Sequence, residues 1–169
     1  FFHMLDEDRQ FFAQQIWSAG ALAACRAASQ GLHFKVDEAG VWADCVRERR
    51  PVIHNDYPTL PHRRGLPPGH PAVARELVVP VIHQERVVAV MGVGNKEQPY
   101  DLHDVAVVSN LSDLLWDIIL RKRAEEKSAL QALVLDQAQD RVTIIGLDGV
   151  IRYVNRAQCQ GLKCREDDL

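Results

Sequence analysis

Two apolar runs near the middle of this chain constrain its fold more than any other feature of the sequence. Glu76–Ile82 and Arg86–Val93 are both rich in valine, and the polar residues from His83 to Glu85 separate them. Each run has the length of a β-strand and is too short for an ordinary helix. A β-hairpin is therefore predicted at the centre of a sheet. Its nearly continuous apolar character indicates strands covered on both faces, or on one face with a ligand cavity over the other.

Three residues, two within these runs and one directly after the second, predict local departures from a regular hairpin. Pro80 offers no backbone N–H to a strand ladder, so it predicts a bulge or an edge register in the first strand. Gly92 and Gly94 leave room for a close neighbour, which could be another backbone, a helix or a ligand.

The segments before the hairpin predict further strands and two helices around the same sheet. Short apolar stretches with polar flanks predict strands at Phe1–Leu5, Phe11–Trp17, Leu32–Val36 and Val52–Asn55. Helices are expected over 19–28, ended by Gly31, and from an N-cap at Asp37 to Arg49, ended by Pro51. The second helix should bury its apolar residues, which are Val41, Trp42, Cys45 and Val46.

Residues 56–74 form the least regular part of the sequence, because prolines and glycines recur through them. A long irregular segment inside a compact domain is usually functional or mobile. Strands, helices and an irregular segment around one sheet indicate the α+β fold class, with a central antiparallel sheet flanked by helices.

From Asp101 onwards the apolar residues follow a helical period. Spacings of three and four relate Leu102, Val105, Val108, Leu111, Leu115 and Ile118. Asp101 and Asp104 suit the N-terminal end of a helix, where the helix dipole favours acidic groups. The run RKRAEEKS at 121–128 keeps strong helix formers but loses the apolar stripe, so 121–139 is predicted to be a solvated helical linker.

The period changes again near the end of the chain. VTIIGLDGVIRYV at 142–154 predicts two strands around a turn at Leu147 to Gly149, and a short helical stretch after Asn155. The order of strand, Asp-Gly turn, strand and Asn-x-Ala resembles the opening of a PAS domain. Lys163 stands where that family usually has a glycine. The resemblance implies that 140–169 is only the start of such a domain.

Several ordered segments of the longer N-terminal part resemble a GAF domain of bacterial multidomain sensor proteins. They are RRPVIHND at 49–56, the loop up to Gly69 and His70, RELVVPV at 75–81 and VGNK at 93–96. The resemblance covers 1–120 and implies a sensory module of a histidine kinase or a cyclic-dinucleotide signalling enzyme. It implies a long C-terminal signalling helix that leads into the PAS-like strands.

Composition narrows the classes of function. The chain has 169 residues, a formal net charge of −3 and 25% charged residues, so it offers no electrostatic basis for binding nucleic acid. Its apolar runs fall short of the ~20 residues that span a bilayer. The cysteines, Cys25, Cys45, Cys159 and Cys164, form no CxxC pair, which fits a reducing cytoplasm. The chain starts without methionine, and we expect it to be a piece of a longer protein that lacks the start of its first domain.

A small-molecule pocket is expected between the sheet and the irregular segment. An aromatic wall and a few polar groups are typical of such pockets, and the GAF resemblance places pockets in this region. The candidate residues are Trp42, His54, Asn55, Asp56, His62, His70, Arg75 and Glu76. The alternative is that Trp42 is a core residue and that Arg75 and Glu76 form a salt-bridged edge.

The histidines His54, His62 and His70 recur every eight residues. Imidazoles in a cleft can hold a metal or a haem iron. Spacing of eight in a proline-rich loop does not by itself bring three ligands together, unlike HExxH on one helical face. No metal site is therefore predicted, and the sequence names no cofactor.

Lys96 and Asp104 are expected to form an ion pair, called here the clasp, between the end of the hairpin and the start of the long helix. Asn95, Lys96, Tyr100 and Asp104 resemble part of the motif of cyclic-nucleotide-binding GAF domains. That motif has a phenylalanine where this chain has Tyr100, and a final acid where it has Val105. The departures argue against nucleotide binding and favour a structural role for the clasp.

The sequence thus predicts a sensory module without a catalytic motif, in which a small ligand or a partner acts on the long helix. One alternative is a dimerisation scaffold without a ligand. Another is a cysteine-based redox enzyme that uses Cys25 and Cys45. A parallel homodimer through 101–139 is expected because the apolar arc, including the side of Trp116, is wide enough for a sheet and a partner.

Overall fold

The computed structural model describes residues 1–6, 8, 10–24, 35–63 and 70–162. The chain divides into two compact units, Phe1–Asp117 and Ile118–Leu169, and each unit is described by itself. None of the described helices combines the length and the apolar character that a membrane span requires.

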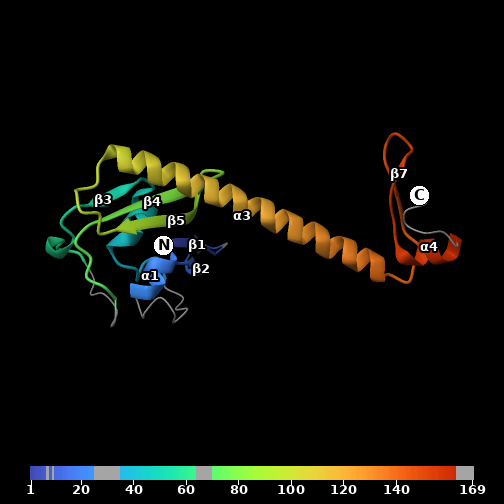
Figure 1. Cartoon of the computed structure of the whole chain (residues 1–169), viewed down its shortest axis with the longest axis horizontal. Coiled ribbons are helices and arrows are strands. Elements are labelled where there is room, and N and C mark those ends of the chain that lie inside the picture. The colour runs from blue at the N-terminus through green and yellow to red at the C-terminus, as the bar shows by residue number, and fades with distance from the viewer. Residues whose placement is uncertain (7, 9, 25–34, 64–69, 163–169) are drawn as a thin grey trace. The chain divides into compact units, whose positions relative to one another are not determined.

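The first unit is built on a five-stranded sheet in the order β2-β1-β5-β4-β3, in which all paired strands are antiparallel (Figure 1). The strands are β1 (Phe2–Leu5), β2 (Phe12–Ile16), β3 (Val52–His54), β4 (Glu76–His83) and β5 (Arg86–Gly94). The predicted hairpin is β4 and β5, and it is central because β1 and β3 flank it. The α+β class with an antiparallel sheet is therefore confirmed.

The hairpin turn consists of Gln84 and Glu85, which both have positive φ angles of 48° and 60°. Two such residues make the turn type whose twist matches the flanking strands. The register shifts between Val81 and Ile82, one residue after Pro80. Within the described ranges, β3 pairs with Glu76–Val78, so Pro80 lies beyond the end of this pairing.

Both faces of the sheet are covered, as the continuous apolar runs predict. Neighbouring residues of a strand point to opposite faces. Val52, Val78 and Val90 pack into one core with Ala43 and Cys45. The alternate residues, such as Leu77 and Val79, are also fully buried. The first part of α3 (Leu102–Gln137) runs along their face of the sheet, and buries Val108, Ser112 and Trp116 (Figure 1).

The predicted helix from Asp37 to Arg49 is wrong in its first half. Residues 36–38 form a turn, Gly40 is extended, and the helical part is η2 (Val41–Ala43) followed by α2 (Asp44–Glu48). The guanidinium of Arg47 donates to the carbonyl oxygens of Val36 and Ala39 at 3.0 and 2.9 Å. These tertiary bonds hold the turn in place of a regular helix.

Other predicted elements agree in type and differ in extent. The first helix is α1 (Ala19–Ala24), and the rest of its predicted range, with Gly31, lies outside the described residues. Most of the predicted edge strand at 32–36 also lies outside them, and Lys35 makes an isolated bridge with Phe11. A short helix, η3 (Tyr57–Thr59), interrupts the irregular segment.

The predicted stripe on the long helix is only partly the buried one. Val108 is buried, but Leu102, Leu111 and Ile118 are exposed. The expectation that a monomer would expose the side of Trp116 is wrong, because Trp116 is 8% exposed and its ring lies 6.2 Å from that of His83. Apolar residues occur almost all round this helix, so their period did not show which side meets the sheet.

The second unit contains the rest of α3, a hairpin of β6 (Thr143–Ile145) and β7 (Ile151–Val154), and α4 (Arg156–Leu162). Gly149 has a φ of 79° in the hairpin turn, which a residue with a side chain rarely adopts. Asn155 is fully buried, and its amide donates to the carbonyls of Leu135 and Asp140. The predicted strands, turn and short helix are therefore present in this unit.

Candidate functional site

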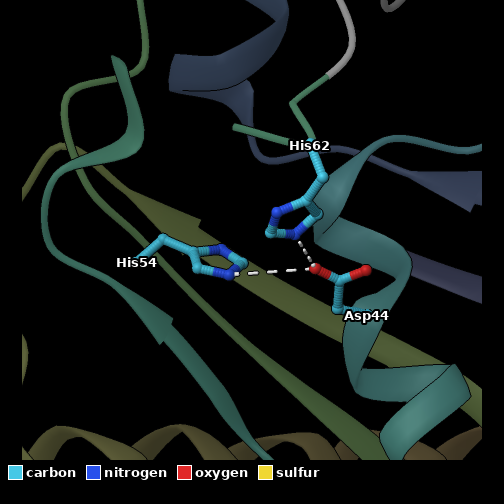
Figure 2. Close-up of side chains that lie close together, drawn as sticks. All are labelled: Asp44, His54 and His62. Atoms are coloured by element: carbon cyan, nitrogen blue, oxygen red, sulfur yellow. Dashed lines mark hydrogen bonds and ion pairs between the residues drawn. The ribbon is translucent and has the colours of Figure 1, made fainter. Parts of the chain in front are cut away.

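A cluster of polar side chains lies on the α2 side of the sheet, where β3 ends. His54 is the last residue of β3, Asp44 is the first residue of α2, and His62 follows η3 in the irregular segment. Figure 2 shows both imidazole rings directed at the carboxylate of Asp44. Three segments that are separate in the sequence therefore meet at one carboxylate.

The two carboxylate oxygens of Asp44 have different partners. Its Oδ1 accepts a hydrogen bond from Arg47 at 2.5 Å. Its Oδ2 lies 2.9 Å from Nε2 of His62 and 3.9 Å from Nε2 of His54. Since Arg47 also binds two backbone carbonyls, Asp44 is held with Oδ2 facing the histidines.

Glu76 completes the cluster from the neighbouring strand. His54 and Glu76 are direct partners in the β3–β4 register, so their side chains share one face of the sheet. Nδ1 of His54 lies 2.8 Å from Oε1 of Glu76. The side chains of His54 and Glu76 are each 9% exposed, so this pair is shielded from solvent.

The other predicted pocket residues do not join this cluster. Asp56 is exposed, and Nδ1 of His70 lies 2.7 Å from the carbonyl oxygen of Pro71. Arg75 donates weakly to the carbonyl of Lys96 at 3.4 Å. The side chain of Asn55 makes two bonds with the backbone of Tyr100, at 2.9 and 2.7 Å.

Trp42 lies in an aromatic cluster towards β1. Its ring is 5.7 Å from Phe1, 5.5 Å from His3 and 4.7 Å from Phe12. His3 is buried, and burial lowers its pKa to about 3. Its Nδ1 and the Nε1 of Trp17 are buried without a hydrogen-bond partner. Alternation within Phe1–Leu5 places His3 on the same face as Phe1 and Leu5, and this was the signal in the sequence that could have identified it.

The clasp is present at the edge of the same unit. Nζ of Lys96 lies 2.8 and 2.6 Å from the two carboxylate oxygens of Asp104. The hydrogen bond that Lys96 donates to Asp104 raises the pKa of Lys96, and the same bond lowers the pKa of Asp104. Oδ2 of Asp104 also accepts from the backbone of Asp101, so the clasp ties the hairpin to the first turn of α3.

The thiol of Cys45 is poorly suited to nucleophilic chemistry. It is fully buried, and burial raises its pKa far above the usual range, with Glu76 and Asp44 adding to the shift. Reactive cysteines need the opposite environment, because the thiolate is the nucleophile. Its supposed redox partner Cys25 lies outside the described residues.

Asp44 and Arg47 are the members of the polar cluster that the sequence analysis missed. Their spacing of three places both side chains on one side of a helical turn, and this was the only available signal. Their role depends on how α2 packs over β3 and β4, which local sequence does not reveal. A hollow of about 140 Å³ lies elsewhere, lined by Val46, Arg49, Glu85, Arg86 and Val87, and contains none of the predicted pocket residues.

These features define an α+β domain with a buried polar cluster on one face of its sheet. The family model described as "GAF domain" matches residues 1–120, which is most of the chain. The chain therefore belongs to the GAF domain family.

The amino-acid sequence is similar to that of a curated protein. The chain is 36% identical over 132 residues to the methyl sulfide methyltransferase-associated sensor of Methanosarcina acetivorans. The match covers 78% of this chain and only 13% of that protein. Together with the family match, it supports a sensory and regulatory module.

Solved structures support the fold. The GAF domain of a phosphoenolpyruvate-protein phosphotransferase from Coxiella burnetii has a TM-score of 0.58 at 16% identity, and covers 75% of this chain and 73% of that one. A methyl-accepting chemotaxis protein has a TM-score of 0.55 at 18% identity, and covers 71% of this chain and 76% of that one.

Proposed function

We propose that this chain is the sensory module of a longer signal-transduction protein, in which a small ligand or partner acts at the β3 end of the sheet and changes α3. A histidine kinase or a cyclic-dinucleotide signalling enzyme is the proposed parent, and the cytoplasm its proposed location. The observation that carries the proposal is the pair of bonds between Tyr100, just before the start of α3, and Asn55, the residue directly after His54 of the polar cluster.

The connection is short in both sequence and space. Asn55 follows His54 directly, and Tyr100 precedes the residue that caps α3. Asp101 accepts hydrogen bonds from the backbone of His103 and Asp104 through its Oδ1, at 2.8 and 3.0 Å. A ligand that shifts His54 would therefore move the residue that anchors the segment before α3.

A ligand can only shift this equilibrium if it binds one arrangement better than the other. The polar groups of the cluster, Asp44, His54, His62 and Glu76, offer a ligand charged and hydrogen-bonding partners on a buried face. We propose that such a ligand favours one arrangement of the 55–62 segment and, through Asn55, one state of the first turn of α3.

We further propose that 121–139 acts as a helical linker and that 140–169 opens a PAS-like domain that receives the signal. The β6–β7 hairpin, the glycine turn and the capping Asn155 support this assignment. In this proposal, the continuous helix α3 is the element that connects sensing to output.

Native mass spectrometry of the purified protein tests the ligand, and hydrogen exchange tests the relay. We expect a retained small molecule that is lost after denaturation. We expect Asn55→Ala to increase exchange of the amides in 102–106 several-fold, since their anchor is removed. The control Asp56→Ala, which changes the exposed neighbouring side chain, should leave exchange unchanged. Equal exchange in both variants would contradict the relay.

A dimerisation scaffold is the second candidate function, and a specific surface favours it. Four large apolar side chains at spacings of four, three and four are exposed on α3: Val107, Leu111, Leu114 and Ile118. Such a stripe is typical of a helix that pairs with another helix. The two functions are compatible, because a dimer can also carry a ligand signal.

A further inference from the structure

We propose that Asp44, His54 and His62 bind one divalent transition-metal ion of the zinc type. Each offers one ligand atom, and these atoms lie within 4.8 Å of one another. The proposal names a class of ligand for the site described under the proposed function. Metal binding itself does not depend on that function, whereas any role of the metal in signalling rests on it.

The tautomer of His54 supports the proposal. Its Nδ1 lies 2.8 Å from the carboxylate of Glu76, an arrangement in which Nδ1 carries the proton and donates it to the carboxylate. The Nε2 lone pair then faces Oδ2 of Asp44 at 3.9 Å. Two acceptors that face each other in a buried place favour a cation between them. A metal ion between them would satisfy both acceptors.

The distance between Nε2 of His54 and Oδ2 of Asp44 is too long for a direct hydrogen bond and suits two ligands of one metal ion better. A zinc ion with ligands at about 2.0–2.1 Å places its donor atoms about 3.4 Å apart in tetrahedral geometry. The two distances to Oδ2 of Asp44, 2.9 and 3.9 Å, lie on either side of that separation. All three donor separations are at most 4.8 Å, so ring movements of about an ångström would bring the donors to bonding distance.

The surrounding groups hold the donors as outer-shell partners do in metal sites. Glu76 orients His54 through Nδ1, and Arg47 orients Asp44 through Oδ1. Carboxylate–histidine pairs of this kind fix the tautomer and raise the basicity of the ligand. Arg47 is in turn fixed by two backbone carbonyls, so both ligands start in place.

The donor set and its exposure indicate the kind of metal. Two imidazoles and one carboxylate are a set that zinc and related ions accept, and three protein ligands leave a coordination position open. The side chain of His62 is 56% exposed, whereas those of His54 and Asp44 are 9% and 11% exposed. The site is therefore accessible from solvent on the His62 side, where a water or an anionic small molecule could complete the coordination.

Calorimetric titration of the chelator-treated chain with zinc chloride tests the site. We expect binding of one zinc ion by the native chain and at least tenfold weaker binding by His62→Ala and Asp44→Asn. Glu76→Gln, which keeps the shape of the orienting group, should weaken binding by up to tenfold. The control His103→Ala removes an exposed histidine on α3 and should bind zinc as the native chain does.

His62→Ala keeps the proposal falsifiable, because its exposed side chain is not needed for folding, whereas Asp44→Asn alters a buried one. Native affinity and stoichiometry in folded His62→Ala would overturn the site. So would a cobalt-substituted chain with a sulfur-to-cobalt charge-transfer band, since that band would assign the metal to cysteines. Failure of zinc to bind the folded native chain would also overturn the site.

The failure of this proposal and that of the proposed function are distinguishable. Absence of zinc binding overturns the metal site and leaves the retained-ligand and Asn55 experiments as the test of the relay. Zinc binding that depends on His62, without any change in exchange at 102–106, upholds the metal site and counts against the relay.

Discussion

Buried polar residues occur in both units of the chain. His3, Glu76 and Asn155 are all buried, but they differ in how well they are paired. Glu76 is hydrogen-bonded to His54, and Asn155 is hydrogen-bonded to several backbone groups. Nδ1 of His3 has no hydrogen-bond partner. A buried polar group without a partner costs stability, and a fully paired one stabilises its surroundings.

His3→Phe should make the domain more resistant to acid. The pKa of His3 is about 3 in the folded chain, because of burial, and its ordinary value is 6.5. Between these values the unfolded chain binds a proton that the folded chain does not, so stability falls as the pH falls through this window. Removing the imidazole should reduce that dependence by about 1.4 kcal/mol per pH unit. Denaturant unfolding at pH 7 and pH 4 measures it.

His103→Phe is the control, since His103 is exposed at the start of α3. The ring of His3 stacks on that of Phe1 with the ring centroids 4.6 Å apart, so a flat phenyl ring can take its place. An unchanged pH dependence in His3→Phe would show that His3 does not titrate differently in the folded chain.

Asn155→Ala should destabilise the second unit by on the order of 2–4 kcal/mol, since it leaves buried backbone groups unpaired. Asn155 accepts from the backbone of Val142 and Gln158, and donates to the carbonyls of Leu135 and Asp140. Asn155→Asp keeps the acceptor but places a carboxylate oxygen against the carbonyls of Leu135 and Asp140, so it should also destabilise the unit. Amide exchange of β6 and β7 measures both, and equal protection in all three proteins would refute the capping role.

At the scale of the element, the clasp decides how firmly α3 begins. The hairpin end supplies Lys96, and the first turn of α3 supplies Asp104. Asn55, which directly follows β3, anchors the intervening residue Tyr100. The start of α3 is thus fixed by residues that follow two strands, in addition to its own cap at Asp101.

Lys96→Ala and Asp104→Ala should each lower the melting temperature, and their effects should be coupled in the double variant. The pKa of Asp104 in the folded chain lies below the ordinary value of 3.8. The stabilisation from this carboxylate is therefore complete above pH 3.8, and it is lost as the pH falls through the pKa of the folded chain. The pKa of Lys96 lies above 10.5, so its contribution is complete below that pH and is lost as the pH rises further. Effects that simply add would exclude the pairing.

At the scale of the whole molecule, we propose that two chains pair through α3. The exposed residues Val107, Leu111, Leu114 and Ile118 are the surface proposed for this contact, because Trp116, part of the arc that the sequence suggested, is buried inside the domain. An isolated helix of the length of the 121–137 segment is marginal in water, and pairing would stabilise it.

We predict a dimer by sedimentation at micromolar concentration. Leu111→Glu and Leu114→Glu should shift it to monomer, because each places a charge in the apolar stripe. Leu147→Glu is the matched control, since Leu147 is a fully exposed apolar residue in the β6–β7 turn. A native chain that sediments as a monomer and stays helical through 124–133 would contradict both the pairing and its reason.

The sequence by itself determined the elements of the fold whose signals are local. Runs of valine around two polar turn residues are enough to specify β4 and β5, and Asp148-Gly149 specifies the β6–β7 turn. The pairing of Lys96 with Asp104 was also accessible, because the two residues are close in the sequence. Local propensity and alternation carry this information without knowledge of the remaining chain.

Only the tertiary structure decided which side of α3 meets the sheet and which residues gather at the polar cluster. Apolar side chains surround the helix, and it was packing that selected Val108 and Trp116 over Leu111 and Ile118. His54 and His62 are eight residues apart in the sequence, and Asp44 joins them because α2 lies over β3. Contacts between distant segments depend on how complete elements pack, and no local pattern records them.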